Sequence, residues 1–173
     1  MTGEQIRHAR ALLAEPPQGS FRSTGPSTSD ESEYLMQITR SSNMNTQKGP
    51  ADWFTGDVYI DAVAAPAGSS TFGAAAVHFT PGARTAWHTH PHGQTIFVTE
   101  GVGLCQREGG PVETLRPGDR VFFEPEENHW HGAAPNRFMT HIAIQQNDES
   151  GNPVTWGRHV ADQEYGTSTT SAD

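Results

Sequence analysis

The sequence predicts an all-β protein built as one closed barrel or sandwich of short strands, and three observations support this. From residue 57 onward, short runs alternate in polarity and are rich in β-branched and aromatic residues. Turn signals such as Pro81-Gly82 and Pro117-Gly118 separate the runs. The 18 glycines and 12 prolines favour turns, and no helical pattern of useful length appears before Asp162 outside the N-terminal region.

The runs predict the strands in order along the chain. Each is bounded by glycine, proline or asparagine, and each is short enough to cross a small barrel once. The predicted strands span residues 57–63, 71–80, 84–90, 95–100, 102–107, 112–115, 120–123, 129–132 and 138–145.

A length of 173 residues fits one domain with flanking segments. Residues 1–45 form a predicted N-terminal extension, with a helical pattern from Thr2 to Pro16 and then a polar stretch, 18–30, that is expected to be disordered. Residues 46–165 contain the barrel pattern. Residues 166–173 are rich in serine and threonine and form a predicted disordered tail.

Composition narrows the partners and the compartment. The net charge of −9 argues against nucleic acid or an anionic membrane as a partner. No apolar run approaches the roughly 18 residues that cross a bilayer, and the N-terminus has no signal-peptide pattern. The single Cys105 excludes an internal disulfide and fits a reducing cytoplasm, where it is expected to be a small strand residue. We therefore expect a cytoplasmic protein that acts on a small molecule.

Histidine clusters in an unusual way, with six of the nine lying between residues 88 and 141. His88 and His90 are two residues apart in a predicted strand, so both side chains point to one face. Two imidazoles at that spacing can share a metal ion. Gln94 follows after a Pro and a Gly, and its amide oxygen could supply a third ligand.

A second pair, His129 and His131, repeats the same spacing after another turn and strand. One His-x-His pair alone is weak evidence, but two pairs in the same structural context predict a metal site inside the barrel. His8 and His159 lie outside this pattern and are expected at the surface. His92 is expected at the rim of the barrel.

These two motifs resemble those of the cupin superfamily, namely Gly, His-x-His and a later Gly in the first, and Pro-Gly, Pro and His in the second. The match runs through residues 82–101 and 117–129. It implies a jelly-roll barrel, also called a double-stranded β-helix, with one divalent metal ion per subunit bound by His88, His90, Gln94 and His129. Cupins usually have Glu where this chain has Gln94. Four neutral ligands leave the ion its full charge, which favours Lewis-acid chemistry over oxygen chemistry.

Further stretches are similar to small bacterial cupins that include manganese-dependent (R)-selective hydroxynitrile lyases. The similar segments are GPADWFTG at 49–56, RTAWHTHP at 84–91, QREGG at 106–110 and HWHGAAP at 129–135, within a resemblance that covers residues 49–165. The resemblance implies a carbon–carbon lyase that splits a cyanohydrin reversibly into aldehyde and cyanide. Its metal is expected to be Mn²⁺, with Fe²⁺, Ni²⁺ or Zn²⁺ as alternatives.

The same resemblance implies roles for further residues. His131 is the first choice for the catalytic acid–base group and His141 the second, because imidazole titrates near neutral pH. For each of them the alternative is a supporting role. Substrate-pocket residues are expected at Ala75, Val77 and Gln145. A homodimer or homotetramer is also expected.

Two other functions stay open at this point. One is a cupin dioxygenase that activates O₂ at manganese or iron, and the other is a metal- or ligand-binding cupin without turnover. Gln94 and the close motif match favour the lyase. Trp87 and Trp130 have the opposite strand parity to the histidines, so we expect them on the outer face, against a second subunit.

Overall fold

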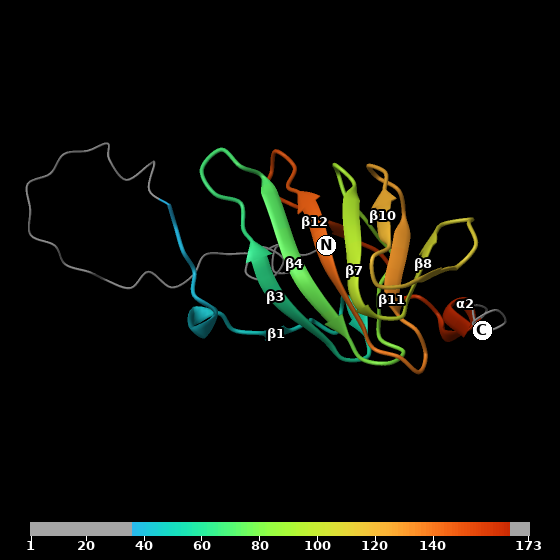
Figure 1. Ribbon diagram of the computed structural model, residues 1–173. Coiled ribbons are helices and arrows are strands. Elements are labelled where there is room, and N and C mark those ends of the chain that lie inside the picture. Colours follow the sequence, from blue (N-terminus) through green and yellow to red (C-terminus); the bar gives the residue numbers. More distant parts are fainter. Residues whose placement is uncertain (1–35, 167–173) are drawn as a thin grey trace, which may run out of the picture.

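The computed structural model describes residues 36–166, which form two antiparallel sheets facing each other (Figure 1). The larger sheet carries the long strands, in the order β1 (Gln47–Lys48), β3 (Val58–Ala64), β4 (Phe72–Phe79), β12 (Met139–Gln146), β7 (Gln94–Gly101) and β10 (Arg120–Phe123). β3 and β4 are consecutive in the chain, whereas β4 beside β12 and β12 beside β7 join strands that are far apart in sequence.

The second sheet is built from shorter strands. Its order is β13 (Thr155–Trp156), β6 (His88–Thr89), β11 (His129–Ala133), β5 (Arg84–Thr85) and β2 (Phe54–Thr55), with β8 (Gly103–Arg107) pairing both β11 and β9 (Glu113–Leu115). Helical structure in residues 36–166 is limited to η2 (Ser41–Asn43) and α2 (Asp162–Gly166). Neither has the length and hydropathy needed to cross a lipid bilayer. The predicted all-β class is confirmed.

One predicted strand is interrupted. The run 84–90 becomes β5 and β6 because Ala86 and Trp87 bond outside the sheet. The Ala86 N–H donates to the Trp53 carbonyl (2.7 Å) and the Trp87 N–H donates to the Arg158 carbonyl (2.9 Å). The sequence also missed β1, β2 and β13, since two residues are too few to show alternation. The predictions for residues 1–35 and 167–173 lie outside the described residues.

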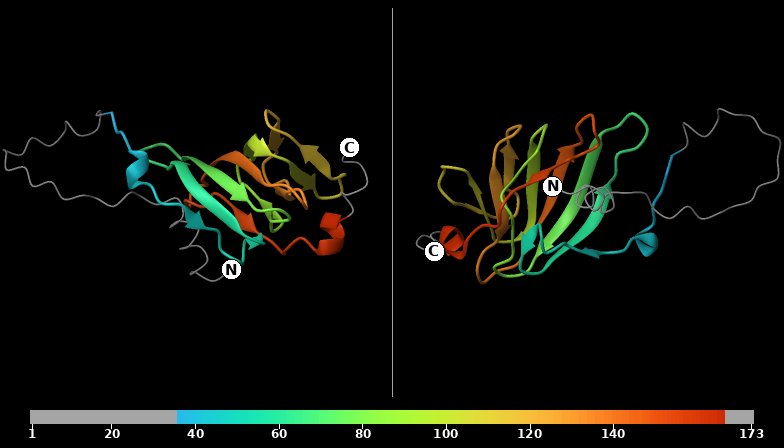
Figure 2. Two further views of the ribbon diagram at one scale, coloured as in Figure 1. Left: turned by 60° about the horizontal axis from the view of Figure 1, so that its bottom comes forward. Right: turned by 180° about the vertical axis from the view of Figure 1, so that it is seen from behind.

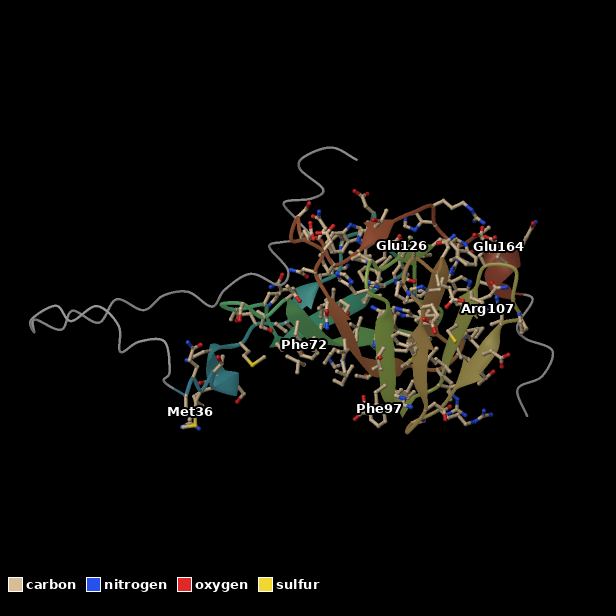
Figure 3. The ribbon with its side chains drawn as sticks, turned by 90° about the horizontal axis from the view of Figure 1, so that it is seen from above. Met36, Phe72, Phe97, Arg107, Glu126 and Glu164 are labelled. Atoms are coloured by element: carbon tan, nitrogen blue, oxygen red, sulfur yellow. The ribbon has the colours of Figure 1, made fainter. Side chains whose placement is uncertain are left out.

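The core lies between the sheets and follows the alternation of the strands. Inward side chains from β3, β4, β7 and β12 are buried, among them Val58, Phe79, Val98 and Met139. Most outward side chains of the same strands are half-buried or exposed, and Phe97 on β7 points away from the barrel (Figure 3). This difference between the two faces of the sheet fixes the strand register, because a one-residue slip would turn the inward side chains outward and the outward ones inward.

The segment after β12 crosses the back of the barrel and ends in α2 (Figure 2). It buries Trp87 and Trp130 in a second apolar cluster with Val160 and Tyr165. The expectation that a second subunit covers these indoles is therefore wrong: the chain covers them itself. The expected homodimer or homotetramer stays a prediction.

Arg84 holds this C-terminal segment in place. Its guanidinium is buried and donates to the Val160 carbonyl from both Nε (3.3 Å) and Nη2 (3.0 Å). Nη2 also bonds Asp162 Oδ1 at 2.5 Å, and the group lies 4.5 Å from the centre of the Tyr165 ring. The Tyr165 hydroxyl donates in turn to the Ala133 carbonyl of β11 (2.8 Å).

We expect Arg84→Met to lower the free energy of unfolding by about 2–4 kcal/mol, because it leaves a buried carbonyl without its charged donor and removes a cation–π contact. Asp162→Ala is the matched control. The Asp162 side chain is 95% exposed, so its loss should cost much less. Urea unfolding at constant m-value measures both, and equal effects would show that the ion pair, not the carbonyl contact, is what matters.

Candidate functional site

Five buried histidines converge between the two sheets. The second sheet supplies His88 on β6, His90 just after it, and His129 and His131 on β11, while the larger sheet supplies His141 on β12. None of the five is more than 3% exposed. The register places His129 directly opposite His88, so the two His-x-His pairs predicted from the sequence meet across one pair of strands.

Backbone carbonyls orient three of these rings. Nδ1 of His88 lies 2.9 Å from the Ala86 carbonyl, and Nδ1 of His129 lies 2.7 Å from the Glu127 carbonyl. Nδ1 of His90 lies 2.7 Å from the Pro153 carbonyl. A carbonyl only accepts, so each Nδ1 carries the proton and each neutral ring keeps a lone pair on Nε2. Phe123 lies flat against His129, with ring centroids 3.7 Å apart, which fixes the plane of that ring.

Burial keeps these rings uncharged. Desolvation lowers the pKa of His90 to about 4 and that of His129 to about 3, and it lowers the pKa of His88 well below its usual value of 6.5. The neighbouring rings of His129 and His90 depress the pKa of His88 further. Neutral imidazole is the form that binds a metal ion, so no proton has to be released first.

Gln94, the first residue of β7, extends its amide between two of the rings. Its Oε1 lies 3.3 Å from His129 Nε2 and 3.2 Å from His131 Nε2, and its Nε2 lies 3.4 Å from Gln145 Oε1. Because His129 Nε2 carries no proton, the first contact brings two lone pairs together. His90 Nε2 is also buried, with no hydrogen-bond partner among residues 36–166. A cation bound among these atoms would interact with the two facing lone pairs of Gln94 and His129 and would give His90 Nε2 a partner.

The donor set therefore fits a metal ion. The ligand nitrogens of His88, His129 and His131 all lie within 4.8 Å of one another, so these three residues could hold one. The sequence-predicted ligands His88, His90, Gln94 and His129 surround the same space. His131, expected as the acid–base group and not as a ligand, also belongs to this close group.

His131 and His141 form a pair of their own. His141 Nε2 lies 3.2 Å from His131 Nδ1, and the His131 backbone N–H donates to Thr85 Oγ1 (3.1 Å). Desolvation lowers the pKa of His141 to about 3 and that of His131 well below its usual value, with His141 adding to the second effect. Both rings are therefore uncharged at neutral pH.

A cavity of about 100 Å³ opens beside these groups. The predicted pocket residues Ala75, Val77 and Gln145 line it, as do His131 and His141. The sequence missed the aromatic part of the lining, which is Trp53, Phe54 and Trp156. Trp53 and Phe54 precede the predicted strands, and nothing local in the sequence indicates that residues 153–156 return to the site.

The other histidines among residues 36–166 do not line the cavity. His92 and His159 are exposed, as expected, and His8 lies outside the described residues. His78 is half-buried on the outer face of the larger sheet, 3.2 Å from both Asp61 and Thr140. Cys105 is buried in β8, and desolvation raises its pKa to about 12, so it remains a thiol.

Two facing antiparallel sheets with histidines from two His-x-His motifs between them define a barrel of the jelly-roll class with a candidate metal site. A family model described as "Cupin domain" matches residues 75–141. The chain is also 54% identical over 130 residues to an (R)-mandelonitrile lyase from Granulicella tundricola, covering 75% of this chain and 98% of the lyase. The chain belongs to the cupin superfamily, in the family of that lyase.

Solved structures agree with this assignment. A cupin-like protein from Thermotoga maritima superposes with a TM-score of 0.66 at 38% identity, covering 72% of this chain and 94% of its own. The polyketide cyclase RemF from Streptomyces resistomycificus superposes with a TM-score of 0.58 at 17% identity, covering 76% and 91%. The second similarity concerns the fold alone.

We expect added Mn²⁺ to raise the melting temperature of chelator-treated protein by about 5–10 °C at a hundredfold excess over Kd, because the ion binds only the folded site. His129→Ala should abolish the shift, since it removes a group with a free Nε2. His92→Ala, which removes an exposed histidine that does not line the cavity, is the control. Differential scanning calorimetry measures the shift, and an equal shift in His129→Ala would place the ion elsewhere.

Proposed function

We propose that this protein is a metal-dependent hydroxynitrile lyase that cleaves an aromatic cyanohydrin reversibly to an aldehyde and hydrogen cyanide. The observation that carries the proposal is the set of neutral, buried histidines that faces an apolar-lined cavity. The relative at 54% identity is an (R)-mandelonitrile lyase, which supports both the reaction and the aromatic class of substrate.

For the metal, we propose one divalent ion per chain, bound by His88, His90, Gln94 and His129. Each of the three rings offers Nε2 because a carbonyl holds its Nδ1, and Gln94 Oε1 faces His129 Nε2. The resemblance to manganese-dependent cupins supports Mn²⁺, although such ligands also accept iron, nickel or zinc. When bound, the ion supplies positive charge that stabilises the negative charge developing on the substrate hydroxyl oxygen.

For the proton, we propose His131 as the acceptor. Its neutral ring lines the cavity, and the hydroxyl proton of the cyanohydrin passes to it as the C–CN bond breaks. The electron pair of that bond leaves with cyanide, the former hydroxyl carbon becomes the aldehyde, and the same proton converts cyanide to HCN. His141, 3.2 Å from His131 Nδ1, orients the ring and shares the added charge.

The apolar lining protects this transfer from water. Trp53, Phe54 and Val77 border the cavity, and the Thr85 hydroxyl accepts a hydrogen bond from the His131 backbone N–H. In this apolar environment the neutral His131 ring does not have to lose bound water before it reacts. Electrostatic interactions with the charges that develop during bond cleavage are also stronger there than in water.

Racemic mandelonitrile under nitrogen tests the activity. Metal-loaded protein should release benzaldehyde and consume one enantiomer first, whereas metal-free protein and His129→Ala should not. Chiral chromatography follows the substrate, and the His92→Ala control should behave as wild type. Absence of cleavage under nitrogen, together with oxygen uptake on another substrate, would replace the lyase by a dioxygenase.

Two histidine variants separate ligand from base. We expect His90→Ala to lose the metal, and His131→Ala to keep it while kcat for mandelonitrile falls by about 100-fold or more. Metal analysis of each dialysed variant and steady-state kinetics give the answer. If His131→Ala instead loses the ion and His90→Ala keeps it, the ligands are His88, His129 and His131.

A further inference from the structure

The outward face of the larger sheet is apolar at its centre. Ile142 and Ile144 alternate with the inward residues of β12, and Phe97 of β7 and Phe122 of β10 are 42% and 53% exposed. An antiparallel sheet that turns one face to water normally carries polar side chains there. Neither η2 nor α2 lies over these strands in Figure 1, so no helix among residues 36–166 covers the face. An apolar patch of this kind is typical of a protein–protein contact.

The strand register arranges this face in rows that cross the sheet. In the central row, Ile142 on β12 pairs with Ala76 on β4 at one side and with Phe97 on β7 at the other. Ala76 pairs in turn with Asp61 on β3, and Phe97 pairs with Arg120 on β10. The row therefore runs from an acid through a small residue, an isoleucine and a large residue to a base. Its two halves are complementary in charge and in size.

The rows on either side show the same asymmetry. The row through Ile144 ends in Ala64 on β3 and in Phe122 on β10, again a small residue and a large one. The other row places His78 on β4 and Glu100 on β7 at the two sides of β12, so a basic ring and an acid are matched. Within one sheet β12 separates these groups. They can meet only when a second sheet faces the first with its two sides exchanged.

We propose that a second copy of this chain packs on this face, related to the first by a two-fold axis that runs along β12. Such an axis exchanges the two sides of β12, so Asp61 meets the partner's Arg120 and Ala76 meets the partner's Phe97. A two-fold axis across the strands would instead place each strand on its own counterpart. Arg120 would then face the partner's Arg120, and the two copies of Ala76 would leave a gap. A self-complementary contact about a two-fold axis is the commonest form of homodimer.

The larger sheet also offers the area that such a contact needs. Its long strands have eight residues. At about 3.4 Å per residue and about 4.8 Å between strands, the face from β3 to β10 covers roughly 24 by 27 Å, or about 650 Å² on each copy. The total of about 1,300 Å² lies within the range of about 1,200–2,000 Å² for stable interfaces. This face differs from the one around Trp87 and Trp130, which the C-terminal segment covers.

Sedimentation velocity of the full chain tests the charged pair, with wild type expected as a dimer at about 10 μM. Asp61→Arg and Arg120→Asp should each raise the dissociation constant by about 10-fold or more, because each brings like charges together across the interface. The double variant Asp61→Arg/Arg120→Asp should restore most of that loss, since the pair forms again with its signs exchanged. Arg107→Asp makes the same charge change on an exposed residue of the second sheet and should leave the dimer intact.

The same logic tests the match in size. Ala76→Phe and Phe97→Ala should each weaken the dimer, and the two together should form it again. Circular dichroism checks the fold of each variant, and the charge variants decide the matter if Ala76→Phe does not fold.

Wild type that remains a monomer at about 100 μM overturns the proposal. If Phe97→Glu then lowers the melting temperature of that monomer, residues 1–35 of the same chain become the cover of the face. A dimer that neither single charge variant weakens, or that the double variant does not form again, overturns the proposal as well. No metal or substrate enters these measurements, so their outcome is independent of the proposed lyase function.

Discussion

The burial of several uncharged imidazoles in one small barrel is the constraint on which the rest of this structure depends. A buried polar nitrogen without a partner is costly, so each ring needs a fixed hydrogen bond. Carbonyls of Ala86, Glu127 and Pro153 accept from the Nδ1 atoms of His88, His129 and His90. With Nδ1 of each ring hydrogen-bonded, the Nε2 atoms face a common centre, where only a bound cation or a shared proton can satisfy their lone pairs.

This requirement shapes the strands around the site. Two of the carbonyls are local, because Ala86 and Glu127 each precede their histidine by two residues, at the point where β6 or β11 begins. The third comes from Pro153, which is brought in by the segment that crosses the back of the barrel. Arg84 and Tyr165 fasten the end of the same segment. The same segment is therefore held against the outside of the barrel by Arg84 and Tyr165 and orients His90 inside the barrel through Pro153.

The parts of the fold and site that depend on local periodicity could be predicted from the sequence. Alternation predicted the long strands, and the His-x-His spacing predicted that His88 and His90 share a face, as the structure shows. The break at Ala86 and the return of Trp156 could not be predicted, because both depend on backbone bonds to residues more than thirty positions away. The nearness of His131 to the ligand group was missed because strand parity gives a face, not a distance.

The neutrality of the site has a consequence for the chemistry. An ion held by imidazoles and the Gln94 amide would have no negative ligand from the described chain, and the nearest acidic residues in sequence, Glu124, Glu126 and Glu127, are not among the residues that line the cavity. A buried charge without a counter-charge is unfavourable, so such a site gains most from a ligand that becomes negative as it reacts. The oxygen and the cyanide of a dissociating cyanohydrin both do so. In the proposed site, the amide at position 94 would thus favour the transition state of carbon–carbon cleavage over the neutral substrate, which is the difference that accelerates a reaction.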